Sequence, residues 1–147
     1  MKKFLFILVV GLAVYGVVGH APKFFSVGKF FNSELSTSDR ALENAFTNGQ
    51  SNIQVGGSGE VIKILPDDNQ GSRHQRFIIE LNSGQTLLIA HNIDIASKIN
   101  DLNLGDHINF YGEFEWNSKG GVVHWTHHDP KGSHESGWIN HGGKLYQ

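Results

Sequence analysis

The chain of 147 residues contains no cysteine, and this absence excludes several kinds of site at once. It rules out disulfide bonds, zinc sites with thiolate ligands, thiol nucleophiles and a lipid anchor attached to a cysteine. The chain also lacks an excess of positive charge, because 12 Lys and Arg residues face 14 Asp and Glu residues for a formal net charge of -2. Bulk charge therefore gives no basis for binding a polyanion, and nucleic acid is not a favoured partner.

The sequence has no apolar run that is long enough to cross a membrane comfortably. Met1-Lys2-Lys3 precedes an uncharged apolar run of about 16 residues, from Phe4 to Gly19, and a spanning helix needs about 20 residues. A basic start followed by a short apolar run is typical of an export signal. We therefore expect an exported protein, periplasmic or secreted, with no stable membrane span after processing. An uncleaved N-terminal anchor is the alternative, because Pro22 directly follows the candidate cleavage position.

The length allows one domain with its own core and is too short for two. Ser36 to Asp39 has the form of a capping box, and Leu42, Ala45 and Phe46 follow at helical spacing. These residues predict one short helix. The expected division of the chain is an export segment at 1–21, a linker with this helix at 22–55, a β domain at 56–130, and a His- and Gly-rich tail at 131–147 that packs on it.

Alternating apolar and polar positions separated by turn residues predict five strands, at residues 60–65, 74–81, 86–91, 107–116 and 122–128. Between the third and fourth strands, Asp94 as a cap, Ile99 and Leu102 at helical spacing and Gly105 as a stop predict a helix. This order is that of an OB-fold. The expected fold class is mainly β: a five-stranded OB-fold-like Greek-key barrel with a helix between strands 3 and 4 and a short N-terminal helix. A β-sandwich and an SH3-like barrel are the competing folds.

Nine histidines are the unusual feature of the composition. Three of them lie in one seven-residue segment, His124-Trp125-Thr126-His127-His128-Asp129-Pro130. Residues i and i+4 of a strand are roughly 13 Å apart, so two ligands of one metal on a strand must be at i and i+2. Within the segment only His127 and Asp129 have that spacing, and His124 lies too far along the strand to take part. Any site there must recruit residues from other strands.

The OB topology would supply these residues at one end of the barrel. That end receives the ends of strands 1, 3 and 5 and the starts of strands 2 and 4, whereas the opposite end receives only the two hairpin turns. The expected metal ligands are His74, His91, His127, His128 and Asp129. Imidazole and carboxylate groups of this kind suit a divalent transition metal such as zinc. Glu113 and Glu115 fall on a face that alternation predicts to be exposed.

Two further residues at this end are candidates for catalysis. Arg76 could hold an anionic substrate, and Asp68 could take a proton from a water molecule polarised by the metal. The first interpretation is an exported domain that binds a metal ion or a small anionic ligand. The alternatives are a metal-dependent hydrolase that cleaves phosphodiesters, as a nuclease does, and an interaction protein whose histidines form a hydrogen-bond network that holds loops. Asp68 also stands in a polar turn, which would explain it without chemistry.

Several long strings resemble a family of small exported bacterial proteins of unknown function. They run from about Gly57 to the C-terminus and include His91-Asn92-Ile93-Asp94, the segment from His124 to Pro130, and the pattern His134, Gly137, Trp138, His141. The resemblance implies that the histidines belong to the family's own pattern, and it implies no activity.

The export signal and the strand order are also similar to those of the thermonuclease group of secreted OB-fold nucleases. That resemblance would imply a calcium ion held by carboxylates, with two arginines and a glutamate. Only Arg76 lies near the expected end of the barrel, since Arg40 falls in the early helix and Arg73 in a turn. The nuclease mechanism therefore does not carry over to this sequence.

Overall fold

The computed structural model describes residues 36–147, and all structural statements concern that range. The expected export segment and the first part of the expected linker lie outside the described residues. No helix within residues 36–147 combines the length and the apolar character that crossing a membrane requires.

The short N-terminal helix is confirmed as α2, which spans Thr37–Thr47. It begins where the sequence predicts, because the Asp39 backbone N–H donates to the Ser36 Oγ at 3.1 Å and Ser36 thereby caps the first turn. Leu42 and Ala45 are fully buried on the face that packs against the sheet. The helix therefore contributes to the same core as the strands.

Seven strands form one mixed sheet in the order β1-β2-β3-β5-β4-β6-β7. Their bounds are β1 Ile53–Asp68, β2 His74–Glu80, β3 Thr86–Asn92, β4 His107–Glu115, β5 Val122–His124, β6 Trp138–His141 and β7 Lys144–Tyr146. An additional antiparallel pairing between β1 and β4 joins the first five strands into a ring. Only β3 and β5 are parallel neighbours among the described strands. The fold is thus mainly β, as expected, with two strands beyond the five that the sequence predicts.

β1 is 16 residues long because it pairs with two different strands. Its first half pairs with β4, from Ile53 to Glu60, and its second half pairs with β2, from Glu60 to Asp68. A Cβ atom on Gly57 would lie 2.8 Å from the Phe110 ring, and one on Gly59 would lie 2.7 Å from the Glu80 carbonyl oxygen. Glycine at these positions lets β1 pass closely from one partner to the other.

The helix predicted between the third and fourth strands is wrong. Residues 93–106 form turns and irregular chain, and α2 is the only helix among the described residues. The Gln75 side chain makes hydrogen bonds to both backbone groups of Ile99. Its Nε2 donates to the Ile99 carbonyl at 2.8 Å, and its Oε1 accepts from the Ile99 N–H at 2.9 Å. Asp94 does not cap a helix, because its carboxylate accepts from the backbone N–H and the Nε of Arg73. Tertiary contacts thus replace the helical hydrogen bonds.

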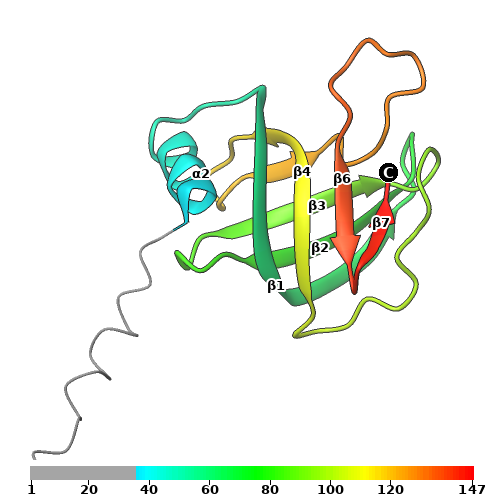
Figure 1. Cartoon of the computed structure of the whole chain (residues 1–147), viewed down its shortest axis with the longest axis horizontal. Helices are drawn as coiled ribbons and strands as arrows, with labels where there is room; N and C mark the ends of the chain where they lie inside the picture. The colour runs from blue at the N-terminus through cyan, green and yellow to red at the C-terminus, as the bar shows by residue number, and fades with distance from the viewer. Residues whose placement is uncertain (1–35) are drawn as a thin grey trace, which may run out of the picture. The chain divides into compact units, whose positions relative to one another are not determined.

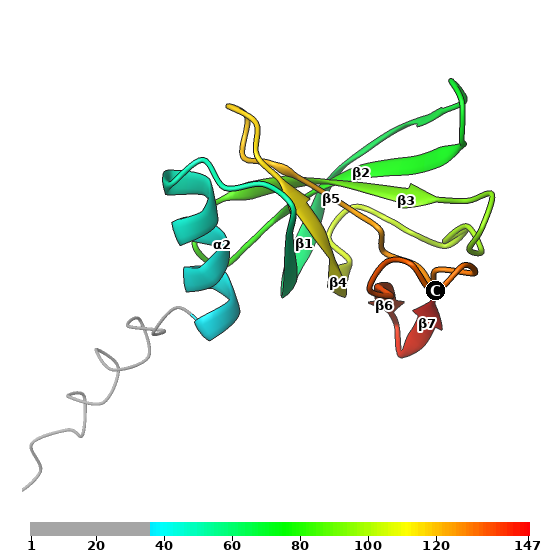
Figure 2. The same cartoon turned by 90° about the horizontal axis from the view of Figure 1, so that it is seen from above.

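Most of the core lies inside the ring of strands and consists of alternate residues from the strands, joined by Leu42 and Ala45 of α2. Its fully buried members include Phe77, Ile79, Leu87, Ile89, Ile108, Phe110, Phe114, Val123 and Ile139. In both views of the fold, β1 and β4 lie between α2 and the hairpin of β6 and β7 (Figures 1 and 2). β6 pairs with the first half of β4, so the C-terminal residues extend the sheet at that edge.

Candidate functional site

The strand predicted at 122–128 ends early, at His124. Trp125 has a φ of 52°, an unusual value for a large side chain, and the strand alternation stops there. The Trp125 ring stacks on the His134 ring, with 4.0 Å between centroids and 8° between planes. The His127 ring lies on the same indole at 5.3 Å. The histidine-rich segment is therefore irregular chain packed around Trp125 rather than a continuous strand with two regular faces.

His91 is fully buried and both of its ring nitrogens have protein partners. Nε2 donates to the Ser97 carbonyl at 3.2 Å, so Nδ1 is the acceptor of the Thr126 hydroxyl at 2.9 Å. Burial is the main cause that lowers the pKa of His91 to about 4, and the nearby imidazoles of His127 and His74 contribute to the same decrease. The structure thus brings three of the predicted ligands near one another, with His91 neutral and hydrogen-bonded in the core.

Asp129 organises the loop that follows it. Its carboxylate accepts hydrogen bonds from the backbone N–H groups of Lys131 at 3.0 Å, Ser133 at 2.6 Å and His134 at 2.8 Å, and from the Ser133 hydroxyl at 3.0 Å. The N–H groups of Lys131 and His134 hold the pKa of Asp129 well below its usual range. Asp129 therefore carries a negative charge that fixes the position of His134.

Replacing Asp129 by Ala is expected to free the 131–134 loop, because three backbone N–H groups lose their common acceptor. Amide hydrogen exchange at Ser133 and His134 should then accelerate by at least about tenfold, whereas exchange in β2 and β3 should not change. Replacing the exposed Asp101 by Ala is the matched control. Unchanged exchange in the 131–134 loop would contradict this role of Asp129.

The remaining predicted metal ligands make local contacts. His74 Nδ1 lies 2.8 Å from the Ser72 carbonyl, and His127 Nδ1 lies 2.9 Å from the His128 carbonyl. His128 is exposed, with its Nδ1 at 3.1 Å from the Ser136 hydroxyl. Metal binding by the five residues predicted from the sequence stays a prediction.

The two candidate catalytic residues make hydrogen bonds within the β1–β2 hairpin. Arg76 directs Nε and Nη2 at the Pro66 carbonyl, at 3.1 and 3.0 Å. The Asp68 carboxylate accepts from the Gln70 backbone N–H at 3.0 Å, as a turn-forming residue does. Their hydrogen bonds thus support a structural role for both residues.

A different group converges on the outer face of β4 and β5. Glu113, Glu115 and His124 each offer one ligand atom, and these atoms lie within 4.8 Å of one another. Glu113 and Glu115 are two residues apart on β4, and His124 pairs directly with Glu113 across the hairpin, so all three side chains share one face. His124 Nε2 lies 3.2 Å from a Glu113 oxygen and 3.9 Å from a Glu115 oxygen. This group could hold a metal ion.

The His124 Nε2 atom is out of contact with solvent and makes no hydrogen bond, although two carboxylates lie close to it. His134 holds the other oxygen of Glu113, since its Nε2 donates to that oxygen at 2.7 Å and its Nδ1 donates to the Glu135 carbonyl at 2.7 Å. Because both acceptors lack a proton, His134 must be an imidazolium when both bonds are made. Desolvation alone would lower the pKa of His134, but these hydrogen bonds outweigh it and raise the pKa.

Glu113 stays ionised in this arrangement. Desolvation would raise its pKa, but the hydrogen bond from His134 and the nearby imidazoles of His124 and His134 outweigh that cost and lower the pKa. The cluster therefore combines a charged carboxylate, a second carboxylate and an imidazole nitrogen without a hydrogen-bond partner. These are oxygen and nitrogen donors that bind divalent transition metals.

Sequence reasoning missed this cluster because it gathered ligands from the strand ends at one end of the barrel and did not pair residues across the hairpin of β4 and β5. Glu113 and Glu115 were predicted to be exposed, and His124 was set aside as too far along its strand. Counting outward from the turn at 117–121 pairs Glu115 with Val122 and Glu113 with His124, as the structure does. The hairpin register was therefore the signal that could have found the site.

A comparison with curated proteins finds no match for this chain. A family model described as "Protein of unknown function (DUF3465)" matches residues 26–147. This range contains the histidine-rich segment, the Glu113, Glu115 and His124 cluster, and the C-terminal strands. It confirms the resemblance to a family of unknown function. Since the match covers most of the length of the chain, the chain belongs to the DUF3465 family.

Proposed function

We propose that this domain binds a divalent transition metal ion, with zinc as the best-suited ion, through Glu113, Glu115 and His124. The observation that carries the proposal is the buried His124 Nε2, which has no hydrogen-bond partner and faces two carboxylates. A buried nitrogen without a partner costs free energy, and neighbouring carboxylates repel each other. One bound cation would remove both costs.

The composition of the cluster supports a site that is open to a ligand. Zinc sites with three protein ligands keep a further coordination position for water or substrate, whereas structural sites have four protein ligands. A metal at this position would attract a small anionic ligand by its charge. His134 supports the site from outside, because its hydrogen bond fixes the second oxygen of Glu113.

We propose a structural role for the histidines that were predicted as ligands. The partners of His91 and the loop contacts of Asp129 support a hydrogen-bond network that stabilises the irregular segment 125–134. The hydrogen bonds of Arg76 and Asp68 favour binding over phosphodiester hydrolysis, because they give both side chains a role within the β1–β2 hairpin.

The proposal also includes an OB-fold-like barrel for the five-strand ring and an exported location. The ring order and the parallel pairing of β3 and β5 support the OB-like arrangement. The five-strand ring differs from the OB-fold because no helix follows β3 among the described residues. The basic start and short apolar run of residues 1–21 support export to the periplasm or beyond.

Calorimetric titration of the purified chain with zinc tests the metal site. Glu115→Gln and His124→Ala are each expected to weaken zinc binding by more than about tenfold, since losing even a supporting contact typically costs ~10–100-fold. Glu80→Gln and His107→Ala are the matched controls, because both residues are exposed and lie outside the cluster. Zinc should also raise the melting temperature of the wild-type chain and of both controls.

Any of three results would contradict the proposal. The first is zinc affinity in Glu115→Gln and His124→Ala equal to that of the wild type. The second is loss of zinc binding in His127→Ala with full binding in the two cluster variants, which would move the site to the residues predicted from the sequence. A wild-type chain that binds no zinc, nickel or manganese would exclude both sites.

A further inference from the structure

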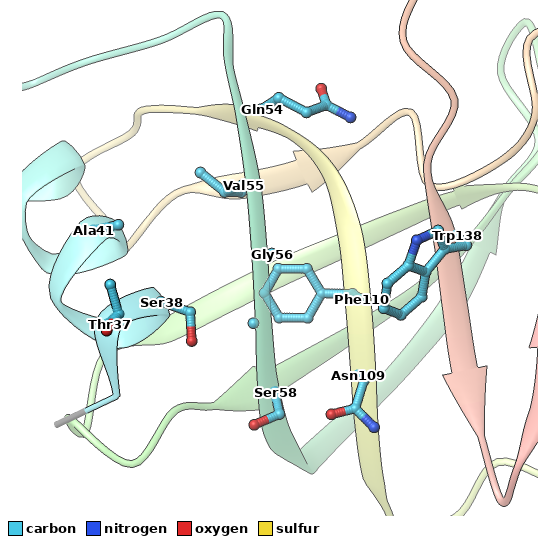
Figure 3. Close-up of a pocket in the computed structure, with 11 residues that line it drawn as sticks. Thr37, Ser38, Ala41, Gln54, Val55, Gly56, Ser58, Asn109, Phe110 and Trp138 are labelled. Atoms are coloured by element: carbon cyan, nitrogen blue, oxygen red, sulfur yellow. The ribbon is translucent and has the colours of Figure 1, made fainter.

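A groove of about 610 Å³ lies over β1, between the start of α2 and Trp138 of β6. Figure 3 shows Thr37, Ser38 and Ala41 of α2 on one side of β1, and Trp138 beyond β4 on the other. None of the described residues that line the groove is charged. The proposed metal ligands are not among them, so this groove is separate from the cluster at His124.

The lining combines an aromatic surface with amide and hydroxyl groups. The half-buried Trp138 supplies the apolar part, and the side chains of Ser38, Ser58 and Asn109 supply donors and acceptors. Trp138 is half-buried and its ring stacks beside Tyr111, with 6.3 Å between centroids and 22° between planes. The indole is therefore held in place before any ligand arrives, which reduces the entropy lost on binding.

Gln54 supplies an independent sign that a ligand belongs here. Its side-chain Nε2 has no contact with solvent and no hydrogen-bond partner, and the residue lines the groove. In Figure 3 the Gln54 amide points away from α2, toward the side of Trp138. A buried amide donor without an acceptor costs free energy, and rotation of the Gln54 side chain toward an oxygen atom of a ligand in the groove would recover it.

We propose that this groove binds a neutral oligosaccharide. Sugar rings carry hydroxyl groups along their edges and C–H groups on their faces, so they match amides and hydroxyls beside an aromatic ring. A nucleic acid would need lysine or arginine side chains for its phosphates, and none lines the groove. A charged sugar acid would lack a counter-charge for the same reason. The proposal goes beyond the metal site and does not depend on it.

Calorimetric titration of the full chain in the presence of EDTA tests the groove without the metal. The probes are neutral hexasaccharides of β-1,4-linked glucose, of β-1,4-linked N-acetylglucosamine and of α-1,4-linked glucose, with hexagalacturonate and single-stranded DNA as charged comparisons. At least one neutral hexasaccharide is expected to bind. Trp138→Ala should weaken that binding by more than about tenfold, because hot spots of binding are enriched in tryptophan. Asn109→Ala should weaken it as well, and it changes only an exposed side chain of β4.

Trp116→Ala is the matched control, since Trp116 is 43% exposed and packs on Phe46 outside the groove. It should bind the sugar as the wild type does. The proposal is overturned if all three neutral probes fail to bind, if only hexagalacturonate or DNA binds, or if Asn109→Ala and a folded Trp138→Ala bind with wild-type affinity. Unchanged circular dichroism establishes that each variant is folded.

Discussion

Replacing Gly137 by Ala is expected to destabilise the domain by about 3 kcal/mol or more, at the upper end of what overpacking costs. A Cβ atom at this position would lie 2.0 Å from the Trp125 carbonyl oxygen and 2.4 Å from the Tyr111 carbonyl oxygen. Both are backbone atoms, so no side chain can move aside to make room. The Gly137 N–H also donates to the His127 carbonyl at 2.9 Å. An alanine at this position would therefore force β6 to shift away from β4 or would break the hydrogen bond between Gly137 and His127.

Urea unfolding of Gly137→Ala and Gly142→Ala measures the effect against a matched control. Gly142 has a φ of 57°, and a Cβ atom there would have no other atom within 4 Å, so alanine meets only the backbone strain. That strain costs about 1–2 kcal/mol. A loss of stability in Gly137→Ala no larger than in Gly142→Ala would contradict the close packing at Gly137.

Acid is expected to destabilise the folded domain by about 2–3 kcal/mol through His91 alone between pH 7 and pH 4.5. Burial lowers the pKa of His91 from 6.5 to about 4. As the pH falls below 6.5, the unfolded chain therefore takes up a proton that the folded chain does not. The stability that neutral His91 provides is complete above pH 6.5 and is lost as the pH falls toward 4.

Urea unfolding at pH 7 and pH 4.5 checks this expectation in the wild type and in His91→Gln. Glutamine can still donate to the Ser97 carbonyl but does not titrate, so the variant should be less stable at pH 7 and should lose less stability on acidification. The difference between the two chains isolates His91 from the carboxylates and from the other histidines. Equal losses in both chains would show that His91 does not drive the acid response.

Local sequence signals predicted α2 and the alternation in β2, β3 and β4, because caps and alternation act over a few residues. The same signals predicted a helix at 94–102 that does not form, since Gln75 of β2 binds the backbone of Ile99. Such a contact spans 24 positions of the chain, and no local pattern reports it. The strands β6 and β7 lacked a sequence signal because each is so short.

For the candidate site, too, the sequence determined one part and the tertiary structure decided the other. Composition and spacing by themselves determined that the chain lacks thiol chemistry, that histidine is the unusual feature of its composition, and that its fold is mainly β. Tertiary structure decided which histidine is available, because His91 is bonded on both ring nitrogens whereas His124 Nε2 has no partner. The physical reason is that availability depends on burial and on neighbours across the sheet, and the pairing of Glu113 with His124 is set by the hairpin register.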